Sequence, residues 1–124
     1  MNIRILAILF VFSVNTSASN PPKTLAEISA NLNKSLPEIF DLVTKLVSTS
    51  VENNNFKYHF IIKANHKEYS WALPKVKSSI LETICSRPRE KLLLKQHRAN
   101  IVYSYENVEG HLLGQFMVKP EHCL

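Results

Sequence analysis

The histidines are the first residues of this 124-residue chain that could do chemistry, because imidazole serves as a general base and as a metal ligand. The five histidines lack the i, i+4 spacing that sets two metal ligands on one helix face. Asp41 is the only aspartate, and the sequence has no HExxH, CxxC, G-x-S-x-G or P-loop motif. We therefore predict no catalytic residue, no metal site and no cofactor. One alternative is a small hydrolase that uses His59 or His111, which could meet across paired strands.

The two cysteines, Cys85 and Cys123, are too few for a zinc site with four cysteine ligands in one chain. In an oxidising compartment such a pair forms a disulfide. By the loop-entropy model, a bridge across this separation of 38 residues contributes about 3–4 kcal/mol. The alternative, one reactive thiol and one bystander, needs an adjacent base and an exposed site. We predict a structural disulfide.

The N-terminal segment has the three parts of a secretory signal peptide. Arg4 supplies a positive charge, an apolar run follows it, and small polar residues come next. The run is shorter than the roughly 20 residues of a membrane-spanning helix, and no cysteine follows it that could carry a lipid. We predict a signal peptide over residues 1–18, cleaved after Ala18 or alternatively after Ser19. The domain over residues 19–124 would be periplasmic or secreted, with no stable membrane insertion.

Hydrophobic periodicity and turn residues predict the elements of this domain. Thr24 and Glu27 match the capping box that begins a helix, and Pro74 suits the first turn of another. Residues 35–38 leave two alternatives, the start of a second helix or the end of the first. The predicted helices are 25–34, 74–85 and 88–96, and the predicted strands are 43–51, 56–62, 100–106 and 111–119.

The order α-β-β-α-α-β-β predicts a single small α+β domain, in which an antiparallel sheet packs against the helices. The disulfide would attach the end of the long helix to the end of the last strand. Alternation of Val43, Lys45, Val47, Thr49 and Val51 favours a strand over a helix in that stretch.

Positive charge is concentrated in the middle of the chain. The net charge is +5, and residues 57–98 hold ten basic side chains against three acidic ones. Such a region could meet an acidic protein, an anionic lipid surface or nucleic acid, or could simply be solvated. Export disfavours nucleic acid, and strand-spaced aromatic residues are explained by a buried sheet face. Four basic residues are candidate contacts for a protein partner: Arg87, Arg89, Lys91 and Lys95.

Tyr69 and Trp71 are the other candidate contacts, because they lie beside Lys67 and Lys75 and aromatic residues are enriched at interaction hot spots. The alternative is that Trp71 covers the edge of the core beneath the long helix.

A spaced pattern runs through the second half of the chain: Cys85, a short helix, Tyr103-Ser104-Tyr105, a turn at Gly110 and the terminal Cys123. This pattern resembles the quorum-sensing-regulated virulence factor family of small exported bacterial proteins. The resemblance implies a disulfide-bonded α+β domain with a strand before Tyr58, and it brings no catalytic residues with it. At the end of the second helix, where that family tends to have glycine, this chain has Arg98-Ala99-Asn100.

These observations predict an exported, non-enzymatic binding or accessory protein that acts through contact with a protein partner. The basic segment favours an acidic partner, and the resemblance implies an association with virulence. The alternatives are a periplasmic immunity protein or enzyme inhibitor, and the small hydrolase. An assembly factor for a secretion or pilus system is a further alternative, which the missing lipid-attachment cysteine disfavours.

Overall fold

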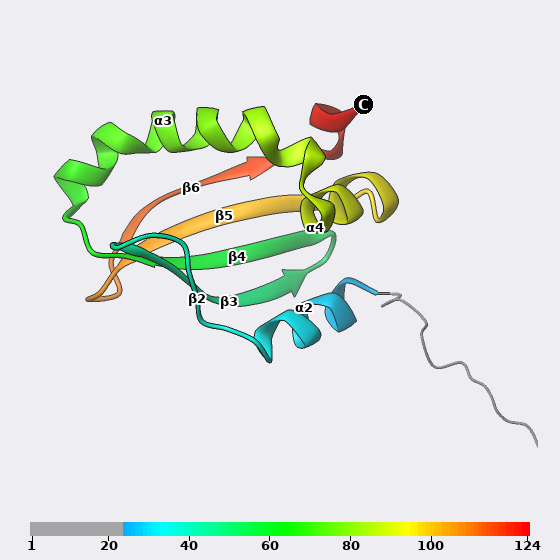
Figure 1. Cartoon of the computed structure of the whole chain (residues 1–124), viewed down its shortest axis with the longest axis horizontal. Helices are drawn as coiled ribbons and strands as arrows, with labels where there is room; N and C mark the ends of the chain where they lie inside the picture. The colour runs from blue at the N-terminus through cyan, green and yellow to red at the C-terminus, as the bar shows by residue number, and fades with distance from the viewer. Residues whose placement is uncertain (1–23) are drawn as a thin grey trace, which may run out of the picture.

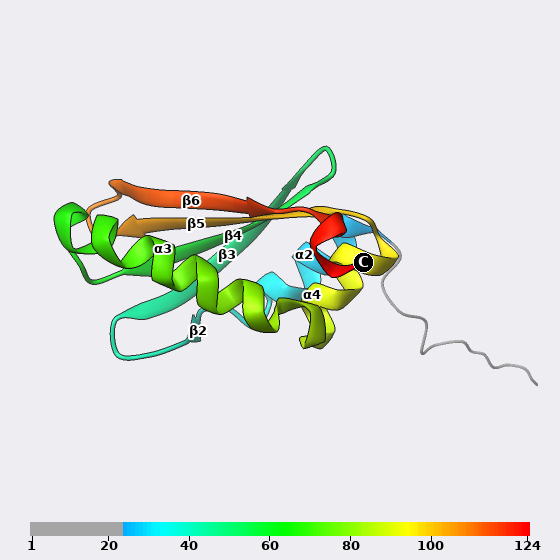
Figure 2. The same cartoon turned by 90° about the horizontal axis from the view of Figure 1, so that it is seen from above.

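The computed structural model describes residues 24–124, and within residues 66–71 it describes the backbone only. The predicted signal peptide over residues 1–18 therefore lies outside the described residues. The described chain is one α+β domain, a five-stranded sheet with its helices on one face (Figures 1 and 2). The helices are α2 (Leu25–Asn33), α3 (His66–Thr83) and α4 (Pro88–Lys91), and the helical turns are η2 (Ile84–Ser86), η3 (Leu92–Gln96) and η4 (Pro120–Cys123). The strands are β2 (Glu38–Ile39), β3 (Thr44–Glu52), β4 (Asn55–Ile62), β5 (Asn100–Asn107) and β6 (Leu112–Val118).

The sheet is mixed, which corrects the prediction of an antiparallel one. The strand order is β2-β3-β4-β5-β6, and the central pair β4–β5 is parallel while the other pairs are antiparallel. The helical segment between these two strands explains the difference. With 18 residues, α3 is about 27 Å long, so it carries the chain back to the end of the sheet where β4 began. The next strand must then run in the same direction as β4.

Helix α3 begins at His66, eight residues before the predicted start at Pro74. Pro74 lies inside the helix and is exposed, whereas Leu73, Val76 and Ile80 are half-buried against the core. An interior proline removes one backbone hydrogen bond. On the exposed side of the helix, water can satisfy the carbonyl group that loses its partner. The helix therefore continues through a residue that the sequence pattern assigned to its first turn.

A β-bulge at Val47 changes which side chains of β3 face the core. The register shifts between Leu46 and Ser48, so Leu46 and Thr49 are both buried although they are three residues apart. The predicted strand is confirmed. The extra residue reverses the alternation of buried and exposed side chains partway along the strand.

Polar contacts hold α2 on β3. The capping box at its start is confirmed, since the Glu27 N–H donates to Thr24 Oγ1 at 3.0 Å. The Asn33 side chain accepts from the Thr49 N–H at 2.8 Å and donates to the Thr49 carbonyl at 3.0 Å. It thus makes the same pair of hydrogen bonds that the backbone of a neighbouring strand would make. Residues 35–38 end this helix and lead into β2, which settles the two alternatives left open at that point.

Helix α3 packs against β6, at the edge of the sheet, rather than over its centre (Figure 1). The contact is tight at Gly114, where an added Cβ would lie 2.6 Å from the Leu73 Cδ2 atom. The predicted disulfide is confirmed: Cys85 in η2 is bonded to Cys123 in η4, with 5.4 Å between the Cα atoms. Both ends of the crossover are thus attached to the β6 side of the sheet.

Arg98 has a φ of +52°, in the left-handed region that disfavours side chains with a Cβ. Replacing Arg98 by glycine should remove about 1–2 kcal/mol of conformational strain. Glycine also makes the unfolded chain more flexible, and this entropy offsets about 0.5–1 kcal/mol of that gain. We therefore expect Arg98→Gly to raise the free energy of unfolding by up to about 1 kcal/mol, measured in urea.

Lys95 is the control for that substitution, because it is exposed within the helical turn η3 and has no positive φ. Lys95→Gly should lower the free energy of unfolding by about 1 kcal/mol. Equal losses in the two variants would contradict this account of Arg98.

Candidate functional site

Aromatic side chains on the parallel strands β4 and β5 form the floor of a groove. Phe60 pairs with Tyr105 in the register, and their rings stack with centroids 4.8 Å apart. Tyr103 lies beside Phe60 at 6.1 Å, also stacked. All three residues face the helical side of the sheet because they alternate along their strands. Since α3 lies over β6, it leaves this aromatic floor open to a cavity.

The cavity has a volume of about 380 Å³ and runs between α3 and the turn that joins β2 to β3. Val76, Ser79 and Ile80 form its wall on α3. Phe40 forms the opposite wall and meets the ring of Phe60 edge-on at 5.2 Å. This groove has the concave, mostly apolar shape that is typical of binding sites.

The β2–β3 turn carries an exposed apolar run, of which Phe40 lines this groove, whereas Ile39, Leu42 and Val43 line a separate cavity of about 780 Å³. Ile39, Phe40, Leu42 and Val43 are exposed to 69%, 45%, 97% and 47%. Asp41 lies in the middle of this run, and its Oδ1 is used within the turn: it accepts hydrogen bonds from the Val43 and Thr44 N–H groups, both at 2.8 Å. A contiguous exposed apolar segment of this kind marks an interaction surface.

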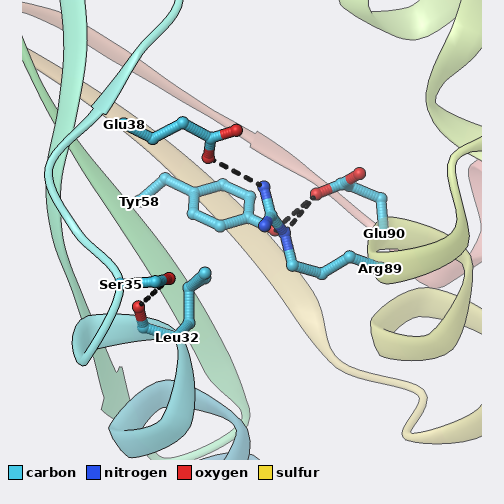
Figure 3. Close-up of polar contacts among 6 residues, drawn as sticks. All are labelled: Leu32, Ser35, Glu38, Tyr58, Arg89 and Glu90. Atoms are coloured by element: carbon cyan, nitrogen blue, oxygen red, sulfur yellow. Dashed lines mark hydrogen bonds and ion pairs between the residues drawn. The ribbon is translucent and has the colours of Figure 1, made fainter.

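A buried polar cluster fixes the position of β2 relative to α4 (Figure 3). The Tyr58 hydroxyl donates to Glu90 Oε2 at 2.5 Å, and Arg89 Nε donates to the same carboxylate at 3.1 Å and to the Tyr58 hydroxyl at 3.0 Å. Arg89 also reaches Glu38 of β2, with 4.0 Å between its terminal nitrogen and Glu38 Oε1. Because Glu38 lies two residues before Phe40, this ion pair connects α4 to the strand that leads into the groove wall.

The phenol of Tyr58 stays neutral in this cluster. Burial raises its pKa well above the ordinary value, and the neighbouring Glu90 carboxylate raises it further. The Arg89 guanidinium lies over the Tyr58 ring, 5.4 Å from the centroid, and its charge acts in the opposite direction. A neutral phenol can donate to Glu90, so every charged group of the cluster has a partner.

Tyr103 differs from Tyr58 because its hydroxyl has no hydrogen-bond partner in the described part of the chain. The residue is only 4% exposed and lines the groove. Burial raises the pKa of Tyr103, the Glu90 charge raises it further, and the charges of Arg87 and Arg89 lower it. The hydroxyl is therefore a neutral donor at the α4 end of the groove.

The four basic residues predicted as partner contacts differ in their exposure and in whether they line the groove. Arg87 is exposed and lines the groove, while Lys91 and Lys95 are exposed outside the residues that line it. Arg89 is half-buried and is already paired with Glu90 and Glu38. The side chains of the two aromatic candidates, Tyr69 and Trp71, lie outside the described residues. The groove residue that sequence reasoning missed is Phe40; its signal was a run of large apolar residues interrupted by one aspartate.

His59 and His111 do not meet, because β5 lies between β4 and the strand that follows His111. His59 Nε2 instead lies 2.9 Å from Ser50 Oγ of β3, on the sheet face opposite the groove. Among the described side chains, those of residues 24–65 and 72–124, no three His, Cys, Asp or Glu gather closely enough to hold a metal ion. None of the described helices has the length and apolar character needed to cross a membrane.

Three solved structures share this fold. One is a Pseudomonas aeruginosa protein described as secreted, with 19% identity and a TM-score of 0.70 over 81% of this chain and 89% of that one. Another is the pilotin EpsS of the Vibrio vulnificus type 2 secretion system, with 18% identity and a TM-score of 0.64 over 81% and 88% of the two chains. The third is the type II secretion system pilotin AspS of Vibrio cholerae, with 15% identity and a TM-score of 0.62 over 80% and 88%. No protein-family model and no curated protein matches the chain.

The two tyrosines on the groove side give a matched test of the polar cluster. Tyr58→Phe removes a donor from the buried Glu90 carboxylate, so we expect the free energy of unfolding to fall by about 1–3 kcal/mol. Tyr103→Phe removes a hydroxyl that has no partner in the described chain, so it should leave stability unchanged or slightly higher. Urea unfolding of both variants measures the difference, and an equal loss in the two would contradict the roles assigned here.

His59 should make the fold less stable in mild acid. Partial burial lowers its pKa below the ordinary 6.5, the charge of Lys57 lowers it further, and Glu106 acts in the opposite direction. The unfolded chain therefore binds a proton more readily, and stability falls as the pH drops through 6.5 towards the pKa in the folded state. We expect His59→Gln to lose less stability than the wild type between pH 7.5 and pH 5.5. A steeper loss in the variant would contradict this sign.

Proposed function

We propose that this chain is an exported accessory protein, without catalytic activity, that binds an apolar segment of another protein in the groove between α3 and the β2–β3 turn. The observation that carries the proposal is an open cavity with an aromatic floor, whose wall on the β2–β3 turn is the exposed Phe40. Burying these aromatic side chains against a partner removes apolar surface from water, which is the main driving force of association.

Export is supported by the apolar N-terminal segment and by the disulfide, since such bonds persist in oxidising compartments such as the periplasm. The proposal places the protein in the periplasm or outside the cell. Its membership of the quorum-sensing-regulated virulence factor family, and with it an association with virulence, is part of the same proposal and rests on the sequence pattern around Cys85, Tyr103 and Cys123.

The partner we propose is a component of an envelope secretion system. The support is the fold, which the chain shares with two pilotins of type II secretion systems. The groove adds a physical reason, because a site of this size accepts a short segment of a larger protein rather than a whole domain face.

Ser79 allows the groove to be blocked without disturbing the core. It is exposed on α3 and lines the cavity, so arginine at this position would project into the binding space. Ser78 is its neighbour on the same helix, is equally exposed and is not a lining residue, so Ser78→Arg adds the same charge and bulk elsewhere. The oxidised protein, carrying a photocrosslinking amino acid in place of Phe40, is the probe.

We expect one protein of the exported fraction to crosslink to position 40 of the wild-type protein. Ser79→Arg should reduce its yield at least tenfold, while Ser78→Arg should leave it unchanged. A crosslinker in place of Met117, which is 41% exposed on β6 and lies outside the groove, should not capture it. Capture that is insensitive to Ser79→Arg would overturn the proposed site.

A further inference from the structure

Two side chains at the α4 end of the groove have hydrogen-bond donors that no described residue accepts from. The hydroxyl of Tyr103 has no partner in the described chain. The guanidinium of Arg87 donates through Nε to Thr83 Oγ1 at 3.2 Å, and no carboxylate among the described residues forms an ion pair with it. Both residues line the same cavity. They also line a smaller hollow beside it, together with Arg89 and Glu90.

The unpaired hydroxyl is the more informative of the two. Arg87 is exposed and can be solvated, but Tyr103 is 4% exposed, and a buried donor without a partner costs about 1–3 kcal/mol. Tyr58, on the neighbouring strand and at the same level in the register, has its hydroxyl fully engaged. The lack of a partner at Tyr103 is therefore a property of the groove end and not of buried tyrosines in this sheet.

Of the two arginines at that end, one has carboxylate partners and the other has none among the described residues. Arg89 is balanced by Glu90, at 3.1 Å, and it also faces Glu38. Arg87 is therefore the arginine of this end that forms no ion pair with a described carboxylate. A single carboxylate would neutralise Arg87 and accept from the hydroxyl, and arginine and carboxylate have matching planar geometry. A doubly charged phosphate would add a second negative charge beside the buried Glu90.

We propose, resting on the function proposed above, that the partner's segment places a carboxylate at the α4 end of the groove, where it is bound by the guanidinium of Arg87 and the hydroxyl of Tyr103. The apolar residues of the segment then lie over the aromatic floor towards Phe40. The carboxylate belongs either to an aspartate or glutamate side chain or to the C-terminus of the partner chain, since both offer the same two oxygen atoms.

Two displayed peptide libraries test the proposal and separate the two sources. In one the random segment lies between fixed flanks, and in the other it ends in a free C-terminus; both are selected on the oxidised protein. Enrichment of apolar residues with an acidic side chain from the first library indicates a side-chain carboxylate. Enrichment of apolar peptides only from the second library indicates a terminal carboxylate.

Substitutions then show whether the carboxylate contacts the assigned residues. For a selected peptide, we expect Arg87→Gln to weaken binding at least tenfold and Tyr103→Phe about threefold or more. Replacing the acidic group of the peptide by its amide should weaken binding to the wild-type protein as much as Arg87→Gln does. For that amide peptide, Arg87→Gln should then cause almost no further loss of affinity. Lys91→Gln is the matched control for lost positive charge, because Lys91 is exposed and lies outside the groove, and it should change binding less than twofold.

The results distinguish failure of this inference from failure of the proposed function. Some selected peptides could bind the Ser79→Arg variant weakly and yet carry no acidic group, or bind the Arg87→Gln variant as well as the wild type. Either result would overturn the carboxylate site and leave the groove as the binding site. Selected peptides that ignore Ser79→Arg would overturn the groove itself. Unfolding of Arg87→Gln and Tyr103→Phe in urea, at a midpoint no lower than that of the wild type, excludes loss of folding as the cause.

Discussion

The parallel pairing of β4 with β5 is the constraint on which the rest of the molecule depends. A parallel pair cannot be joined by a tight turn, so about forty residues must leave the sheet and return to it at the same end. That crossover contains α3, and Gly114 lets α3 approach β6 closely at the edge. A helix in that place covers the edge of the sheet, and buried rings at the centre of β4 and β5 line the cavity beside it. The groove is thus a consequence of strand topology and of one missing Cβ.

Two arginines separated by a single residue have different roles because their surroundings differ. Arg89 is half-buried; it pairs with Glu90 within α4 and, at 4.0 Å, with Glu38 of β2. Arg87 stands outside this cluster and remains available to a ligand. The same division separates Tyr58 from Tyr103. The molecule therefore has a satisfied polar cluster that holds its structure and, beside it, a polar pair that is not satisfied.

The sequence predicted the class of fold and most elements, because alternation, capping residues and the cysteine pair are local signals. It did not predict the direction of β5, since nothing local distinguishes a parallel from an antiparallel partner. It also placed Pro74 at the start of a helix, because a proline normally interrupts a helix, and its exposure, which allows the helix to continue, is not visible in the sequence. Of the site, Arg87 was foreseen from charge alone. Phe40 was missed, since a large apolar residue in a sequence is normally assigned to the core, and only the fold shows that this one lies at the surface.

The disulfide has a mechanical consequence. A force applied between the start of α2 and the C-terminus would pass along the chain to Cys85 and then directly to Cys123, with a sequence separation of 38 between them. Strands β5 and β6 and helix α4 lie inside this covalent loop and would carry none of the load. Stretching would therefore separate α2, β2, β3, β4 and α3, while the last two strands stay protected from the pull. A protein that is gripped at its C-terminus would keep the part of its groove floor that β5 supplies.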